Sequence, residues 1–224
     1  MKKPLPRRII FIFFAASAAL FSLPAAAVSD RRIEDARFAC LAFIKGEQEK
    51  ARPKAIRRAQ VARFWVVSFL TGKFEADEVL EFSEQSESAE SDIVARVKEF
   101  CSGRENVSIH AAAVYAGESP RPLPSTTDIG LDPRIYSCAS YSADRESRKY
   151  RDQAKAAEFW AFAFVQGNIS VRYHPRVVVS VSDKRKIVRA LKASCARNPT
   201  RNLLDQTAEI AYRVRPDWDQ GDWD

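Results

Sequence analysis

The sequence predicts an all-α protein made of two tandem small helical bundles, each closed by one disulfide. Two observations predict this class. An alanine-rich segment without proline, with aromatic residues at helical spacing, occurs twice, at 55–70 and at 153–165. Four cysteines also lie at equivalent places in the two copies of this pattern: Cys40, Cys101, Cys138 and Cys195.

The first 27 residues are expected to be a signal peptide that is removed from the mature protein. Four cations between Lys2 and Arg8 precede an apolar run over 9–23, and the alanines at 25–27 provide a cleavage site. The apolar run is shorter than the roughly 20 residues that span a bilayer, which favours cleavage over an uncleaved anchor. We therefore expect a periplasmic protein that has no membrane span after cleavage.

Composition and charge argue against several functional classes. The 36 Lys and Arg and 29 Asp and Glu give a net charge of +7, but loss of the four cations in residues 1–27 leaves +3. Nucleic acid is therefore not an expected partner. Only 7 glycines occur, with no two in one phosphate-binding loop, so P-loop and dinucleotide-binding motifs are excluded.

Catalytic chemistry has no support in the sequence either. His110 and His174 have no cluster of potential metal ligands near them, and no serine or cysteine nucleophile can be assigned beside them. We expect both histidines to be surface or capping residues. The carboxylates form no paired motif of the kind that glycosidases use. The chain is therefore predicted to be non-enzymatic, without a metal or a cofactor.

A repeated unit organises the mature chain. The pattern from Ala59 to Gly72 occurs again from Ala154 to Gly167, with every matched residue 95 positions later. Further matches flank it on both sides: Cys40-x-x-Phe43 with Cys138-x-x-Tyr141, Ile93 to Cys101 with Ile187 to Cys195, and Asn106-Val107 with Asn202-Leu203. The duplication predicts disulfides within each copy, Cys40–Cys101 and Cys138–Cys195, because small exported domains gain stability from such cross-links.

We expect five segments along the chain. They are a signal peptide at 1–27, a first repeat at 28–117, a proline-rich linker at 118–133, a second repeat at 134–213 and an acidic tail with two tryptophans at 214–224. Within the repeats, Gly72 and Gly167 are expected to terminate helices as C-caps. Ser88 and Ser182 are expected to cap the helices that follow, and 169–181 is either a strand or an extended loop.

The segments that follow the two glycines differ in charge. Eight acidic residues and one basic residue lie in the stretch from Lys73 to Asp92, whereas 168–182 contains Arg172 and Arg176 and no acid. Two interpretations stay open. The two segments are solvated differently, or they are complementary faces through which the copies, or two chains, meet.

These motifs resemble the HdeA/HdeB family of periplasmic acid-stress chaperones. The resemblance covers both copies and rests on the Cys-x-x-aromatic start, the aromatic helix followed by glycine, and the helix that reaches the second cysteine. The segment from Cys195 to Pro199, followed by Leu203-Leu204 and Ala208, is also similar to that family. The chain departs from the family in being a tandem and in having Ala39 and Ser137 where the family has threonine.

The resemblance implies helical bundles around one disulfide, units that pair, and binding of unfolding client proteins in acid. We therefore expect the two repeats to pair within the chain, with Glu78 and Glu81 near the contact. Protonation of all 29 carboxylates and both histidines raises the charge from +3 to about +34, which should loosen the bundles while the disulfides keep them compact. The expected client-binding residues are the aromatics of the repeated helix: Phe64, Trp65, Phe69, Phe159, Trp160 and Phe164.

A second functional class is open from the sequence. Small exported immunity proteins, and other modules that bind one specific protein partner, also use helical units closed by cysteines. A holdase suppresses aggregation of unrelated proteins at low pH, whereas a module of this second kind forms one tight complex at neutral pH.

Overall fold

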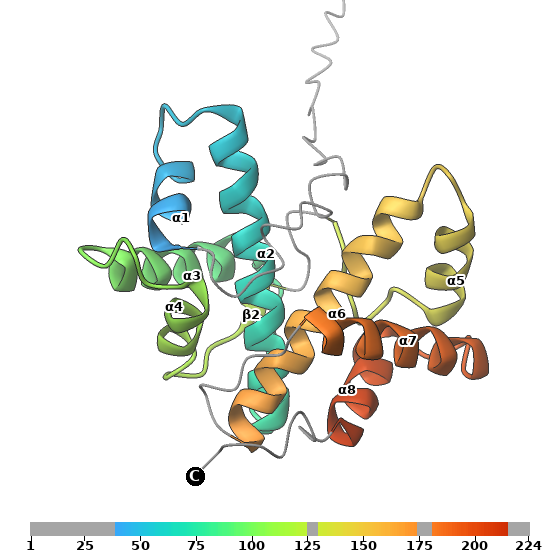
Figure 1. The fold of residues 1–224 in the computed structure, drawn as a ribbon. Coiled ribbons are helices and arrows are strands. Elements are labelled where there is room, and N and C mark those ends of the chain that lie inside the picture. The colour runs from blue at the N-terminus through green and yellow to red at the C-terminus, as the bar shows by residue number, and fades with distance from the viewer. Residues whose placement is uncertain (1–38, 125–129, 174–180, 215–224) are drawn as a thin grey trace, which may run out of the picture.

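The computed structural model describes residues 39–124, 130–173 and 181–214. Within these ranges the chain forms helices α1 to α8 and two short strands (Figure 1). The first half contains α1 (Cys40–Gly46), α2 (Pro53–Ala76), β1 (Phe82–Ser83), α3 (Ser86–Cys101), α4 (Ile109–Ala116) and β2 (Leu123–Pro124). The second half contains α5 (Cys138–Glu146), α6 (Arg151–Arg172), α7 (Val181–Arg197) and α8 (Leu203–Arg213). The expected all-α class is confirmed.

Four expectations fall on residues outside the described ranges. They are the signal peptide at 1–27, the tryptophans of the acidic tail, the surface or capping position of His174, and the valines of the possible strand at 177–179. The part of that segment that is described, Ile169 to Arg172, belongs to α6. Among the described helices, none combines the length and the apolar character that are needed to cross a membrane.

Each half is closed by one disulfide between its first and third helices. Cys40 is joined to Cys101 across 61 residues, and Cys138 is joined to Cys195 across 57 residues. The predicted pairing within each half is therefore confirmed. The backbone next to the two disulfides is hydrogen-bonded in the same way. The amide of Cys40 donates to the carbonyl of Val107 at 2.8 Å, and the amide of Cys138 donates to the carbonyl of Arg201 at 2.8 Å.

The start of the last helix corrects the repeat alignment. Ser108 caps α4 by accepting a hydrogen bond from the amide of Ala111, and Asn202 caps α8 by accepting one from Asp205. Asn202 therefore corresponds to Ser108, 94 positions earlier, and its match with Asn106 is wrong. The offset of 94 positions between Cys101 and Cys195 therefore also relates the residues that follow them, as far as the start of the last helix of each half. The expected cap at Ser88 is also wrong, because α3 already begins at Ser86.

The sequence predicted that the two repeated glycines terminate helices, and this prediction is wrong. Helix α2 continues through Gly72 to Ala76, and α6 continues through Gly167 to Arg172. The glycines instead lie where the two helices cross. A Cβ atom added to Gly72 would lie 1.8 Å from the carbonyl oxygen of Phe164, and one added to Gly167 would lie 1.8 Å from that of Phe69. Glycine is needed there because the two backbones touch.

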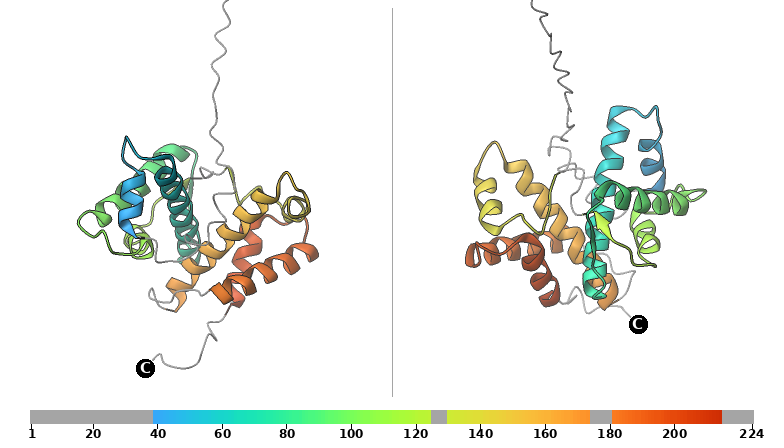
Figure 2. Two further views of the ribbon diagram at one scale, coloured as in Figure 1. Left: turned by 45° about the horizontal axis from the view of Figure 1, so that its top comes forward. Right: turned by 180° about the vertical axis from the view of Figure 1, so that it is seen from behind.

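The two halves pack against each other through this crossing of α2 and α6, which we call the seam. Figure 2 shows the two long helices at the centre, with the short helices of each half on the outside. The rings of Phe64 and Phe159 stack across the seam, with their centroids 5.9 Å apart. One continuous hydrophobic core therefore includes residues of both halves.

Both ends of the predicted linker belong to the fold. Leu123 is fully buried and pairs in parallel with Phe82, so that β2 lies against β1. At the other end, the amide of Leu204 donates to the carbonyl of Pro133 at 3.0 Å. The guanidinium of Arg134 lies 4.7 Å from the centre of the Phe82 ring, which connects the second half to the first.

Candidate functional site

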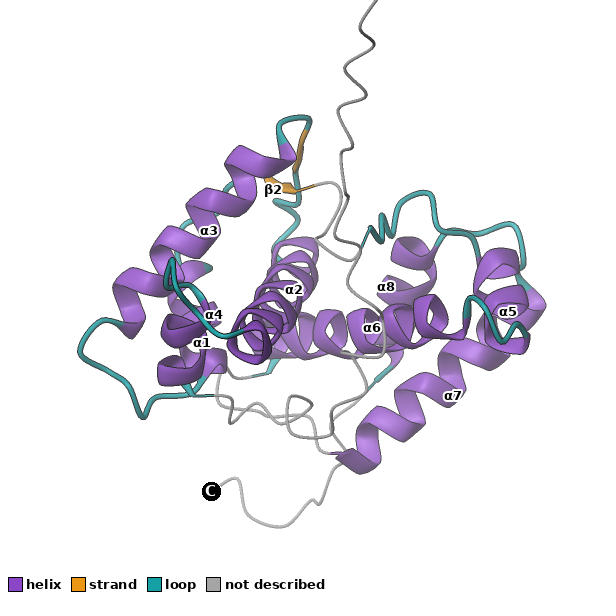
Figure 3. Cartoon of the chain, turned by 90° about the horizontal axis from the view of Figure 1, so that it is seen from above, coloured by secondary structure: helices purple, strands orange, loops and turns teal. Residues whose placement is uncertain are grey.

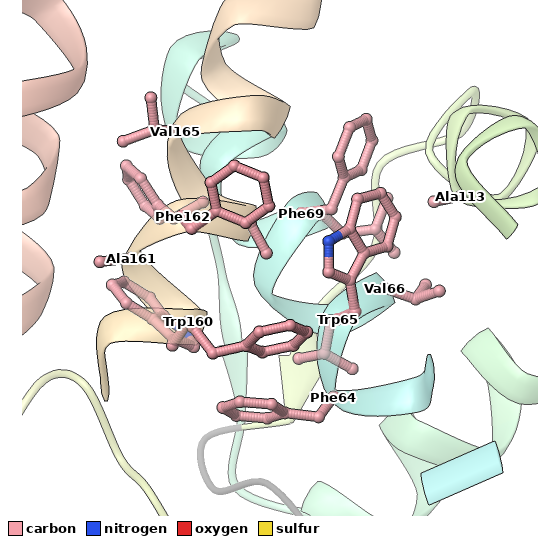
Figure 4. Close-up of a cluster of buried hydrophobic side chains, with 14 of the residues drawn as sticks. Phe64, Trp65, Val66, Phe69, Ala113, Trp160, Ala161, Phe162 and Val165 are labelled. Carbon is pink, nitrogen blue, oxygen red and sulfur yellow. The ribbon is translucent and has the colours of Figure 1, made fainter. Parts of the chain in front are cut away.

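The six predicted client-binding aromatics form the centre of the core. Each is at most 3% exposed. Figure 4 shows Phe64, Trp65 and Phe69 from α2 beside Trp160 and Phe162 from α6. We call the six predicted residues the aromatic centre. Because their rings are covered in this folded state, a client can reach them only after helices separate.

Each long helix stacks its own tryptophan on the phenylalanine one turn later. The Trp65 and Phe69 rings are 5.2 Å apart, and the Trp160 and Phe164 rings are 5.0 Å apart. The spacing of four residues places both rings on one face of a helix. The spacing of the aromatic residues in the sequence therefore accounts for the grouping of these rings.

His110 lies in the core, and the expectation of a surface or capping residue is wrong, because Ser108 is the residue that caps α4. His110 is the second residue of α4 and is 7% exposed. Its ring meets those of Trp65 and Phe69 at near-right angles, with centroids 6.0 and 5.3 Å away. The buried Nε2 atom has no hydrogen-bond partner among the described residues. The sequence contained a signal, because the Ile109–Ala116 segment is otherwise alanine-rich and apolar.

Burial lowers the pKa of the His110 imidazole below its ordinary value, since the charged form would lose its hydration. In the unfolded chain a histidine takes up a proton near pH 6.5. The unfolded state therefore binds more protons than the folded state as the pH falls below this value. The free energy of unfolding must decrease over this interval, until the pH passes below the lowered pKa of the folded state.

The carboxylate that joins the halves is Glu75, rather than Glu78 or Glu81, which are exposed. Its Oε2 atom accepts a hydrogen bond from Nδ2 of Asn168 on α6 at 2.9 Å. Burial raises the pKa of the Glu75 carboxyl, and Asn168, Tyr212 and Arg172 partly offset this effect.

The raised pKa of Glu75 gives the seam the opposite response to acid from that of His110. The folded state takes up this proton at a higher pH than the unfolded chain does. Protonation of Glu75 therefore increases the free energy of unfolding as the pH falls. Protonation of His110 therefore weakens the contact of α4 with α2, whereas protonation of Glu75 does not weaken the contact of α2 with α6.

A cluster of ion pairs lies between α1, α2 and α3. Arg63 on α2 is 3.3 Å from Glu47 and 3.3 Å from Glu90 on α3. Lys98 lies 3.1 Å from the other oxygen of Glu47. Glu47, Glu90 and Arg63 are all less than a quarter exposed, so these charges are screened less than those at an open surface.

The second half has a similar cluster in which two of the charged positions are reversed in sign. Glu158 on α6 occupies the position of Arg63, and Arg145 occupies that of Glu47. Glu158 lies 3.6 Å from Arg145 and 3.6 Å from Lys192, the counterpart of Lys98. The hydroxyl of Tyr141 also donates to it at 2.9 Å. An ion pair thus joins the same two helices in both halves, although each partner has changed sign.

The described part of the chain contains no candidate metal centre. Within 39–124, 130–173 and 181–214, no three His, Cys, Asp or Glu side chains lie close enough together to hold a metal ion.

The fold and the buried aromatic centre define a helical, disulfide-closed protein whose distinctive residues lie inside its core. No family model, curated protein or solved structure matches the chain. The resemblance to the HdeA/HdeB family therefore stays an interpretation of its sequence.

Proposed function

We propose that this chain is a non-enzymatic periplasmic acid-stress holdase that binds unfolding client proteins through its aromatic centre. The proposal rests on the resemblance to the HdeA/HdeB family and on one structural observation. This observation is the position of His110, a buried titratable group in contact with Trp65 and Phe69. Uptake of a proton is thereby linked to exposure of the residues that would bind clients.

Nε2 of the His110 imidazole has no hydrogen-bond partner among the described residues, so the charged ring is stabilised when α4 leaves α2 and water enters. Departure of α4 uncovers Trp65 and Phe69 in the first half. Protonation of the carboxylates adds general repulsion and removes the anions from both ion-pair clusters. The two disulfides are stable in acid. The expected product is a compact, partly helical state that exposes apolar surface.

The direct test measures aggregation of two unrelated client proteins by light scattering at pH 3 and pH 7, with and without this chain. We expect scattering to fall at pH 3 only, for both clients. Dye binding and tryptophan emission should report opening over the same pH range. If opening occurs with no fall in scattering, the holdase proposal is wrong, and a module that binds one specific partner becomes the better account.

Replacement of His110 by leucine tests the structural observation. Leucine keeps an apolar side chain against Trp65 and Phe69 but takes up no proton, so the opening midpoint should move to lower pH by about half a unit or more. His174→Leu is the matched control, because it removes a histidine from elsewhere in the chain. An unchanged midpoint in the His110→Leu variant, or equal shifts in both variants, would contradict the assigned role of His110.

A further inference from the structure

The two halves of the chain carry very different charge. Residues 39–124 contain 12 Lys and Arg and 13 Asp and Glu, whereas residues 130–214 contain 16 and 8, for net charges of −1 and +8. The difference is greatest between α3 and α7, which occupy equivalent places in the two halves. Helix α7 has six basic residues and a single acid, Asp183. Helix α3 has four acids and two basic residues.

The basic residues of α7 lie mainly on its solvent-facing side. Arg185, Lys186 and Arg189 are exposed, whereas Ile187 and Leu191 are buried in the core. Arg185 and Arg189 are four residues apart and therefore lie next to each other on the helix surface. Together with two residues nearer the end of the helix they form the basic face of α7: Arg185, Lys186, Arg189, Lys192 and Arg197.

The corresponding helix of the first half, α3, carries exposed acidic residues, most of them at other positions than the basic residues of α7. With the offset of 94, Asp92 on α3 occupies the position of Lys186 on α7. Ser91 and Ala95 occupy those of Arg185 and Arg189. Acidic residues are exposed along α3 and in the turn before it, and we call them the acidic face of α3: Glu81, Glu84, Glu87, Asp92 and Glu99.

The two faces lie on opposite sides of the molecule. Figure 3 shows α3 on one side and α7 on the other, with α2 and α6 between them, and Figure 1 agrees. One chain therefore cannot bring its own acidic and basic faces together. Two chains cannot exchange both contacts in a closed symmetric dimer either. A contact between unlike faces on opposite sides repeats from one copy to the next.

We propose that the basic face of α7 docks on the acidic face of α3 of a second copy, which links copies head to tail. The occupant follows from charge complementarity, which steers association and suppresses contact between like faces. A 17-residue helix is about 25 Å long, so one face of it buries less area than the roughly 1,600 Å² of a standard stable interface. The contact is therefore weak and sensitive to salt. This inference does not depend on holdase activity.

Sedimentation equilibrium of the mature chain at pH 7 tests the proposal directly. In about 20 mM NaCl, where screening is weak, the weight-average mass should rise with concentration to about twice the monomer value or more near 0.5 mM. In about 500 mM NaCl, where the Debye length is only a few Å, it should return to the monomer value. The proposal is overturned if the chain stays a monomer at every concentration in low salt. Binding of the basic face to anionic vesicles would then indicate a membrane surface as its partner in place of a second copy.

Charge reversal identifies the faces. Arg185→Glu with Arg189→Glu leaves the basic face with three cations and two anions, and Glu87→Lys with Asp92→Lys leaves the acidic face with three anions and two cations. Each double variant has lost most of the charge difference between its two faces, so it should be a monomer on its own. An equal mixture of the two should associate again, because the unaltered acidic face of one variant meets the unaltered basic face of the other. The control, Lys54→Glu with Arg57→Glu, changes the net charge equally at an exposed site on α2 and should associate like the unaltered chain. Association of either double variant alone, or none in the mixture, overturns the assignment.

Discussion

Replacement of Gly72 by alanine is expected to lower the free energy of unfolding by about 2 kcal/mol or more. An added Cβ would lie 1.8 Å from the carbonyl oxygen of Phe164. This contact is with backbone, so no side-chain rotation relieves it, and α2 must move away from α6. Alanine would otherwise stabilise the interior of a helix by roughly 1 kcal/mol relative to glycine. The sign of the measured change therefore decides between a close crossing and an ordinary helix position.

The double variant Gly72→Ala, Gly167→Ala should cost less than the sum of the two single variants. Once either methyl group has separated α2 from α6, the second meets less resistance. Gly117→Ala is the matched control, because its added Cβ would meet the ends of the Leu70 and Lys73 side chains, which can move. Urea unfolding at pH 7 measures all four. A neutral or stabilising Gly72→Ala would show that the helices do not cross at this point.

The same glycines show how far sequence reasoning reached. Their repetition 95 residues apart correctly marked them as important, and the aromatic residues before them correctly marked a buried helix. The expectation of C-caps was wrong because a glycine that ends a helix and a glycine that permits a helix crossing look alike in one sequence. Only the partner helix distinguishes them, and that contact joins residues about 95 positions apart, Gly72 and Phe164 among them.

Local patterns predicted the disulfides well, because each pair follows from the repeat and needs no knowledge of packing. The apolar segment around His110 indicates a core helix, but which residues its ring contacts could not be predicted in the same way. A single histidine in an alanine-rich segment is compatible with either face of the helix, and the contacts with Trp65 and Phe69 are set by how α4 docks on α2. Glu75 was missed for a related reason, since Glu78 and Glu81 belong to the same acidic run and differ from it only in burial.

The reversed ion pairs could have been found from the sequence. Arg63 and Glu158 are 95 positions apart, in the middle of the repeated pattern, but the repeat is recognised by the residues that are identical in its two copies. Comparison of the positions that differ would have shown opposite charges there. Opposite charges also occur at Glu47 and Arg145. These two residues are 98 positions apart, which is also the offset between Cys40 and Cys138. Paired reversal of this kind indicates contact between two positions, because a single reversal would place like charges together.

Removal of either disulfide is expected to lower the free energy of unfolding at pH 7 by about 4 kcal/mol. Both cysteines of one pair are replaced by serine, so that no free thiol remains. The closed loops of 61 and 57 residues are nearly equal, and so the two variants should lose nearly equal stability. For a chain of this size the melting temperature should fall by roughly 8–16 °C. A difference between the variants above about 2 kcal/mol would contradict an effect that acts mainly on the unfolded chain.

In acid the two disulfide variants should no longer behave alike. The Cys40–Cys101 bond ties α1 to α3 in the half where His110 loosens α4, so its removal leaves that half without a cross-link when the imidazole takes up its proton. The second half has no titratable group assigned to the corresponding contact, since Leu204 on α8 lies 94 positions after His110. Hydrogen exchange near pH 4 should show loss of protection throughout α1 to α4 in the Cys40→Ser, Cys101→Ser variant. The Cys138→Ser, Cys195→Ser variant should retain more protection in its own half. Equal loss in both halves would mean that acid acts through net charge alone and that His110 has no special part in opening.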